Sequence, residues 1–233
     1  MSGPADAATS RWWQTRRGLL AAMGFIAVLA LVLGIGFGRA LMSRFSPESP
    51  AIAGVLIEPP IALPDISLTQ HTGEPLTTAS FQGRWNLLFF GFASCPDVCP
   101  TTLQQLKQAM KMLAARNRDQ DVTVWLISVD PERDTPKRLA EYVSFFNPAF
   151  RGATGSHAEL RKLTQPLGVF YQAEPPKDGG DYYQVQHSGA IFVLNPAARL
   201  QAVFTHPHDM SPVALAEDFD KVRDYFQQAI TRD

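Results

Sequence analysis

The chain has 233 residues, of which 45% are hydrophobic, so it can form one domain with a single core and additional segments, but not two large domains. Residues 1–44 contain five arginines and one acidic residue, whereas the remaining 16 basic and 21 acidic residues give residues 45–233 a net charge of −5. A mildly acidic domain lacks the basic surface that binds a phosphate backbone, which argues against a nucleic-acid partner.

An uncharged stretch, residues 18–38, lies near the N-terminus. As an α-helix it would extend about 31 Å, close to the thickness of a bilayer's hydrocarbon core. A buried core helix is the alternative, but this stretch is apolar on every side. We therefore expect an uncleaved transmembrane anchor at residues 18–42 that follows a cytoplasmic segment, residues 1–17. The arginines before the anchor favour a single-pass orientation with the N-terminus inside and the domain outside. No Ser- and Arg-rich presequence precedes the anchor, which favours the bacterial inner membrane, with the domain in the periplasm, over a mitochondrion.

Residues 43–64 are rich in proline and follow the expected anchor. Repeated prolines favour extended, semi-rigid chain, which would hold a domain away from the lipid. We therefore expect a spacer over residues 43–64 and a folded domain over residues 65–233.

The first half of the domain has the pattern of a β-α-β unit. Residues 86–92 contain a continuous apolar run, which predicts a central strand. Apolar residues at 3-4-3 spacing between Leu103 and Leu113 predict a helix, and residues 122–129 predict a second buried strand. A strand, a helix and a strand in this order indicate a parallel pair.

Three further helices are indicated by their first residues. Thr135 and Pro136 suit the start of a helix that runs towards residue 146, and Ser156 suits the start of a short one. Ser211 and the proline after it predict a final helix with one apolar face.

Between the last two helices, residues 182–187, 190–194 and 200–205 read as strands. Asn195 and Pro196 begin a tight connection, so the last two strands should be antiparallel. A parallel β-α-β half followed by an antiparallel hairpin and a closing helix is the thioredoxin arrangement. We therefore predict an α/β, thioredoxin-like fold with an N-terminal transmembrane helix.

Cys95 and Cys99 are the only two cysteines, and they follow the first central strand. A disulfide between them would close a very short loop and stabilise the domain by only about 2 kcal/mol, which argues against a structural role. A helix N-terminus lowers a thiol pKa and would keep a thiolate available. Thioredoxin-type exchangers have two residues between their cysteines, whereas this pair has three. Positions i and i+4 face the same side of a helix, so both thiolates could bind one ion.

Two thiolates favour a soft or borderline ion such as Cu(I) or zinc, and a third ligand must come from elsewhere. Among the five histidines, the residues alone favour His187 only modestly over His206 and His208. The latter two could form a weak second metal site, but we favour a polar turn that leads into the final helix.

Three motifs in order resemble the Sco/SenC family, over about residues 60–230. They are the segment 89–100 with both cysteines, the segment 127–135, and Gln186-His187-Ser188 before an apolar strand. The resemblance implies a thioredoxin-like fold that binds copper through Cys95, Cys99 and His187. It also implies a role in supplying copper to, or reducing the cysteines of, the dinuclear copper centre of cytochrome c oxidase subunit II. Expected partners are that subunit or another copper protein, and other copper chaperones.

The resemblance leaves the chemistry of Asp130, Arg133 and Asp134 unassigned. Asp130 should follow the carboxyl end of a central strand, where α/β sheets place their sites, but turn formation and helix capping explain both acids equally well. With Asp97, these residues are candidates for supporting the metal ligands or for docking a partner. Many family members have an acidic residue where this chain has Gln186, which removes one group that could orient the imidazole.

Two functions of different classes follow. The first is a copper metallochaperone that binds Cu(I), and could also hold Cu(II). The second is a thiol–disulfide oxidoreductase, in which Cys95 attacks and Cys99 resolves the mixed disulfide. A peroxidase that uses a thiol near Arg133 is a weaker variant of the second, so no enzymatic activity is assigned from the sequence.

Overall fold

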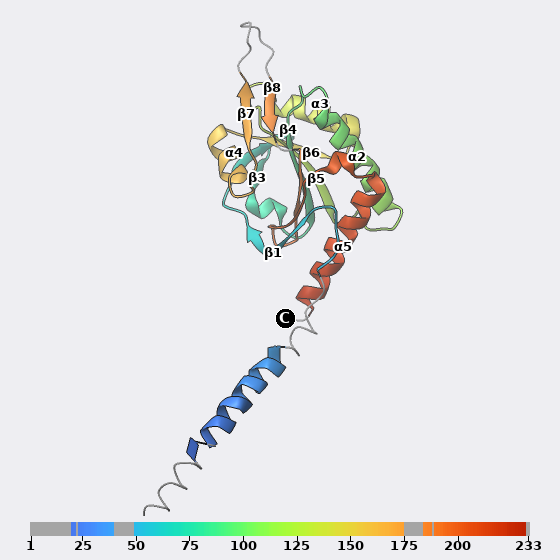
Figure 1. The fold of residues 1–233 in the computed structure, drawn as a ribbon. Coiled ribbons are helices and arrows are strands. Elements are labelled where there is room, and N and C mark those ends of the chain that lie inside the picture. Colours follow the sequence, from blue (N-terminus) through green and yellow to red (C-terminus); the bar gives the residue numbers. More distant parts are fainter. Residues whose placement is uncertain (1–19, 22, 40–48, 175–183, 188, 232–233) are drawn as a thin grey trace, which may run out of the picture. The chain divides into compact units, whose positions relative to one another are not determined.

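The computed structural model describes residues 20–21, 23–39, 49–174, 184–187 and 189–231 (Figure 1). The chain divides into two compact units, Met1–Glu48 and Ser49–Asp233. In the first unit, residues 20–21 and 23–39 are helical. Within the described residues, no helix has both the length and the apolar character needed to cross a membrane. Residues 18–19, 22 and 40–42 of the expected anchor, and all of segment 1–17, lie outside the described residues.

The second unit is built on a mixed sheet of eight strands with the order β1-β10-β9-β4-β5-β6-β2-β3. Its strands are β1 (Val55–Ala62), β2 (Ser67–Gln70), β3 (Pro75–Thr77), β4 (Trp85–Gly91), β5 (Val122–Ser128), β6 (Arg151–Thr154), β9 (Ile191–Leu194) and β10 (Arg199–Phe204). The central strands β4, β5 and β6 are parallel, and β9, on the other side of β4, is antiparallel to it.

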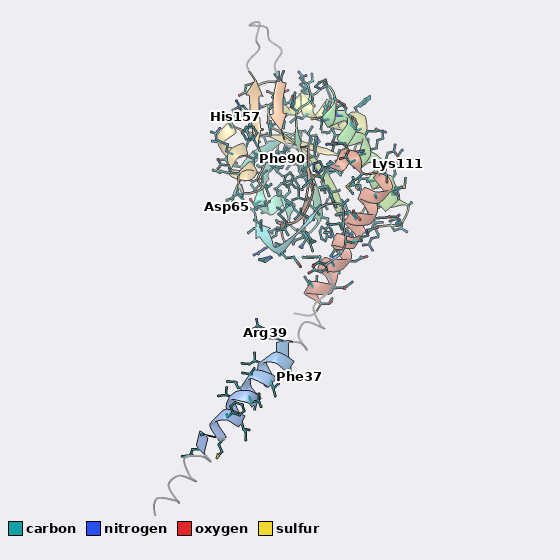
Figure 2. The ribbon with its side chains drawn as sticks, in the orientation of Figure 1. Phe37, Arg39, Asp65, Phe90, Lys111 and His157 are labelled. Atoms are coloured by element: carbon teal, nitrogen blue, oxygen red, sulfur yellow. The ribbon has the colours of Figure 1, made fainter. Side chains whose placement is uncertain are left out.

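The predicted β-α-β unit is confirmed as β4, α2 (Val98–Ala114) and β5. All seven residues of β4 are buried, because it is central in the sheet and covered on both faces. Figure 2 shows Phe90 of β4 inside the domain, and its side chain is fully buried. The buried positions of α2 include Leu103, Leu106 and Leu113, so the apolar spacing of the sequence is the face that packs on the core.

The three other predicted helices are also confirmed. They are α3 (Pro136–Phe146), α4 (His157–Thr164) and α5 (Pro212–Ile230). The side chains of Thr135, Ser156 and Ser211 each accept a backbone hydrogen bond from the third residue after them. The helix starts could be predicted because these hydroxyls satisfy amides that otherwise lack a partner.

The predicted hairpin of β9 and β10 is antiparallel, as expected. The side-chain oxygen of Asn195 accepts hydrogen bonds from the backbone amides of Ala197 and Arg199, and thereby fixes the turn between the two strands. With α5 after it, this hairpin completes the α/β arrangement predicted from the sequence.

Strand β1 lies within the range assigned to the proline-rich spacer. It is an edge strand that pairs antiparallel with β10, so the folded unit includes residues 55–62. The pairing shifts register between Leu56 and Ile61, where Pro59 and Pro60 lie. An edge strand tolerates such prolines because only one of its sides donates to the sheet. The short strands β2, β3 and β6 were not predicted either, because three or four residues carry little periodicity.

Strand β8 (Gln184–His187) differs from the expectation for residues 182–187. Residues 182–183 lie outside the described residues, and β8 does not join the central sheet. It pairs antiparallel with β7 (Tyr171–Glu174), a strand that the sequence did not indicate, in a separate two-stranded sheet. Tyr171 and His187 are directly opposite each other in this pair.

Candidate functional site

Cys95 and Cys99 lie between the carboxyl end of β4 and the first turn of α2. Cys95 is half-buried, whereas Cys99 is fully buried. The Cys95 amide donates to the Phe92 carbonyl oxygen at 3.2 Å, and the Cys99 amide donates to the Cys95 sulfur at 3.4 Å. The two thiols are not joined by a disulfide. The turn therefore brings both sulfurs to the same place, one reachable from solvent and one enclosed.

Burial raises the pKa of the Cys99 thiol strongly, and the neighbouring Cys95 side chain raises it further. A hydrogen bond with the Phe92 backbone acts in the opposite direction but is outweighed. The sequence had suggested that the helix N-terminus would lower the thiol pKa. For Cys99 that expectation is wrong, because the loss of solvent exceeds the helix contribution. In the metal-free protein, burial therefore favours the neutral thiol at Cys99 over the thiolate.

Gly91, the last residue of β4, leaves the space that the Cys99 sulfur occupies. A Cβ atom on Gly91 would lie 2.7 Å from that sulfur and 2.9 Å from the ring of Phe89. Both distances are shorter than real contacts allow. Gly91 is therefore part of the site, because its missing side chain sets the position of a thiol.

The carboxylate of Asp134 ties the cysteine loop to the end of β5. One of its oxygens accepts from the Ala93 amide at 2.8 Å and from the Ser128 hydroxyl at 2.6 Å. Asp134 is fully buried, and this desolvation raises the pKa of its carboxyl group although both hydrogen bonds oppose the shift. The sequence had offered helix capping as one role for Asp134. The structure shows instead that Thr135 caps α3, while Asp134 holds the cysteine loop against the end of β5.

Asp130 lies just beyond the carboxyl end of β5, as predicted. Its carboxylate is 2.5 Å from the Arg133 guanidinium and is almost completely buried. The guanidinium also lies over the ring of Phe92, 5.5 Å from its centre. The pair therefore packs against the start of the cysteine loop. Asp97, in contrast, is exposed, and its side chain makes no capping bond at the start of α2.

His187 is the last residue of β8, and its side chain lies outside the described part of the structure. The hydroxyl of its neighbour across the strand pair, Tyr171, is 3.1 Å from one ring nitrogen of His157, whose other ring nitrogen is 2.9 Å from a carboxylate oxygen of Glu132. The strand that pairs with β8 is thus connected to the loop between Asp130 and Asp134.

His206 and His208 lie at the short 3-10 helix η2 (Pro207–Asp209), and both are exposed. A Cβ atom on Gly189 would be 3.1 Å from the His208 ring and 3.4 Å from Val98 of the cysteine loop. His208 therefore lies closer to the cysteines than the sequence suggested. The side chains that the structure describes do not include that of His187, and among them no group of three or more His, Cys, Asp or Glu residues is arranged to hold a metal.

Comparison with known proteins identifies the family. A family model described as SCO1/SenC matches residues 58–223. The chain belongs to the SCO1/SenC family. Protein SCO2 homolog, mitochondrial, of Bos taurus is 42% identical over 132 residues, which are 57% of this chain and 49% of the bovine protein. This chain therefore spans about half the length of that relative.

Solved structures of SCO1/SenC proteins match the domain. ScoI of Arabidopsis thaliana with copper bound is 31% identical, with a TM-score of 0.63 over 70% of this chain and 98% of that one. ScoI of Bradyrhizobium japonicum with copper bound is 30% identical, with a TM-score of 0.61 over 70% and 99%. The resemblance stated from the motifs is thereby confirmed, as is the thioredoxin-like fold.

Several residues around this SCO1/SenC site had not been singled out from the sequence. Gly91, Ser128 and Arg138 contact or orient the cysteine loop, the last through a 2.7 Å hydrogen bond to the Ser94 hydroxyl. Their spacing from the cysteines carries no signal, because the contacts join β4, β5 and α3. Only Gly91 was visible in the first motif, as an otherwise unexplained glycine in a buried strand.

Proposed function

We propose that this protein is a copper chaperone that binds Cu(I), and can also hold Cu(II), through Cys95, Cys99 and His187. It would supply the ion during assembly of the dinuclear copper centre of cytochrome c oxidase subunit II. The observation that carries the proposal is the adjacent pair of thiols, one half-buried and one enclosed, on a chain of the SCO1/SenC family. Two members of known structure are described with copper bound.

The donor atoms suit this ion. Thiolate sulfur is a soft ligand that favours Cu(I), and an imidazole would complete a site of low coordination number. The raised pKa of Cys99 has a consequence for loading, because its proton must leave when the metal binds. Burial therefore disfavours a free thiolate and favours a thiolate that is neutralised by a cation. Because Cys95 is half-buried, its sulfur can be reached by a protein that donates copper to this chain or accepts copper from it.

Membrane anchoring and a periplasmic location are part of the proposal. They rest on the uncharged residues 18–38 and on the arginines that precede them. Proteolysis of spheroplasts tests them. Digestion of the domain only after the outer membrane is opened, with the chain retained in the membrane pellet, supports an anchor. A domain that is protected in spheroplasts, or released by alkaline washing, contradicts it.

The direct test of the ligands is a Cu(I) titration of the full-length, reduced chain against a competing chelator. We expect the affinity to fall at least about 100-fold in Cys95→Ser and Cys99→Ser and by a smaller factor in His187→Ala, since each loses one ligand. His206→Ala is the matched control and should bind like the unmodified chain. Equal affinities of His187→Ala and His206→Ala would remove His187 from the site.

A second function, thiol–disulfide exchange, is favoured by one observation. The more exposed sulfur is that of Cys95, which is where an attacking thiol must be, and the enclosed Cys99 is placed to resolve. In that reaction the disulfide of a partner is reduced to two thiols while Cys95 and Cys99 form a disulfide. A Cys99→Ser variant would trap the partner as a mixed disulfide through Cys95. Absence of such adducts, together with tight copper binding, would favour carriage alone.

A further inference from the structure

The strand pair β7–β8 contains His187, the proposed copper ligand that is far from the cysteines in the chain. The two strands, of four residues each, pair with each other and form a sheet separate from the central one. His187 is the last residue of β8, and its backbone lies opposite that of Tyr171, the first residue of β7. An isolated strand pair is at best marginally stable, so the position of this one depends on its contacts with the rest of the domain.

Apolar packing provides one such contact. Val185 of β8 is buried and belongs to the hydrophobic core, and the partly buried Tyr171 of β7 packs against that core. The hydrophobic effect removes these side chains from water, but it is not directional. A directional contact is therefore needed to fix how the strand pair sits on the domain.

His157 provides a directional contact by bridging two other side chains. It is the first residue of α4, which lies beside β7 (Figure 1). Its Nδ1 atom is 3.1 Å from the Tyr171 hydroxyl, and the two rings stack with their planes inclined by 19°. Its Nε2 atom is 2.9 Å from a carboxylate oxygen of Glu132. An ionised carboxylate can only accept, so Nε2 donates to Glu132, and in the neutral ring Nδ1 accepts from the Tyr171 hydroxyl.

The other end of this bridge lies in the loop that supports the cysteines. Glu132 is followed by Arg133, whose guanidinium lies over the ring of Phe92 at the start of the cysteine loop. Asp134 accepts a hydrogen bond from the Ala93 amide in the same loop. Contacts of the protein itself therefore connect the segment that contains the cysteines to the strand pair that contains the histidine.

We propose that His157 is a positioning residue, which bonds Tyr171 and Glu132 and thereby holds β7–β8 where His187 can bind the same ion as the cysteines. This inference rests on the proposed function, in which His187 is the third ligand. A ligand that is held near its bound position loses less conformational entropy on binding, so the bridge raises copper affinity without touching the ion. The His157 side chain is 39% exposed, and water competes for its hydrogen bonds, so the effect should be moderate.

Tyr171→Phe tests the bridge, because it removes the hydroxyl and keeps the ring that stacks on His157. Tyr225→Phe is the matched control, since its hydroxyl also bonds a glutamate, Glu58 of the edge strand β1. The measurements on the full-length, reduced chain are Cu(I) affinity by chelator competition and, without metal, amide hydrogen exchange over residues 184–187. We expect Tyr171→Phe to weaken Cu(I) binding about fivefold and to speed exchange at least about threefold. Tyr225→Phe should change neither.

Two substitutions of Glu132 test the other end of the bridge. Glu132→Ala removes the acceptor for His157 and should weaken Cu(I) binding about as much as Tyr171→Phe does. Glu132→Gln keeps a side-chain oxygen that can accept, so it should bind Cu(I) like the unmodified chain. Equal losses in the two Glu132 variants would assign the effect to the lost charge and would overturn the bridge.

A double-mutant cycle separates positioning from a general loss of stability. In a His187→Ala background, Tyr171→Phe should cause no further loss of Cu(I) affinity, because the bridge acts through His187. A loss that persists undiminished there would overturn the inference. So would unchanged affinity or unchanged exchange in Tyr171→Phe when His187→Ala itself binds more weakly. If His187→Ala bound Cu(I) like the unmodified chain, the proposed ligand set would fail and the inference with it, so the two failures can be distinguished.

Discussion

Charged side chains gather in two regions of the domain, and burial makes the two regions different. Beyond the carboxyl end of β5, Asp130 and Asp134 have exposed fractions of 1% and 0%. Just after the C-terminal end of α2, Arg116 pairs with Glu217 and Asp220 of α5 while keeping 42% of its side chain exposed. Buried charges near the cysteines are each fixed by a partner, whereas those on the helix pair remain in contact with solvent.

The difference in burial determines how much a substitution in each region should change stability and copper binding. A buried group that loses its partner costs free energy, and it also moves whatever it was holding. An exposed ion pair contributes little, because water and salt screen it. Substitutions near the cysteines should therefore alter both stability and copper binding, and those between the helices should alter neither by much.

The largest effect should come from Gly91→Ala. Its new Cβ atom would overlap the Cys99 sulfur and the ring of Phe89, and overpacking of this kind destabilises a core by about 3 kcal/mol. We also expect the displaced sulfur to weaken Cu(I) binding. Urea unfolding and chelator competition measure the two effects.

Gly152→Ala is the control for Gly91→Ala. Its Cβ atom would be 3.0 Å from that of Leu139, so it too strains the core, but it approaches neither cysteine. It should lower stability while copper affinity stays unchanged. If both variants lost copper affinity equally, Gly91 would have no specific role in placing the sulfur.

A smaller loss is expected for Asp134→Ala. The variant leaves the Ala93 amide and the Ser128 hydroxyl without their acceptor, which should destabilise the domain by about 2 kcal/mol. Asp134→Asn keeps an oxygen acceptor and should recover most of this loss. Urea unfolding at neutral pH measures both, and an alanine variant as stable as the asparagine one would contradict the assigned hydrogen bonds.

The same carboxylate should give stability a pH dependence. Its pKa in the fold is raised above the ordinary 3.8, so the folded state binds its proton more tightly than the unfolded state does. The contribution of Asp134 is therefore fully present below pH 3.8 and is lost as the pH rises through the folded-state pKa. Asp134→Asn should gain stability relative to the unmodified chain over this rise in pH. A difference that is constant with pH would show that the carboxyl pKa is not raised.

The smallest effect should come from Arg116→Ala, on the exposed side of the comparison. Its ion pairs are partly solvated, so we expect a change in unfolding free energy within about 0.5 kcal/mol and unchanged copper binding. Urea unfolding at low and high salt checks this. A loss above about 1 kcal/mol would show that the exposed ion pairs of Arg116 contribute about as much to stability as the buried charges near the cysteines do.

The sequence predicted the elements whose residues carry local signals. Continuous apolar runs marked β4 and β5, and hydroxyl residues marked the starts of α3 and α5. It did not predict β1, because the prolines that suggest a spacer are also compatible with an edge strand. Nor did it predict the strand pair β7–β8, where the pairing depends on contacts far along the chain.

The residues of the site also divide into those that the sequence could identify and those that it could not. The cysteines could be found from their spacing and the family motifs, since these are continuous in the chain. The roles of Asp134 and Arg138 could not, because each contacts the cysteine loop from another element of the fold. The pKa of Cys99 was misjudged for a related reason. A helix start can be read from sequence, whereas the burial that outweighs it depends on packing.

The central claim is that Cys95, Cys99 and His187 bind one copper ion together. The most direct measurement is absorption and electron paramagnetic resonance of the Cu(II)-loaded full-length chain, with each residue replaced in turn and His208→Ala as control. We predict a thiolate-to-copper absorption that either cysteine-to-serine variant alters or removes, a changed resonance spectrum in His187→Ala, and no change in His208→Ala. A spectrum that His208→Ala alters and His187→Ala does not would contradict the claim.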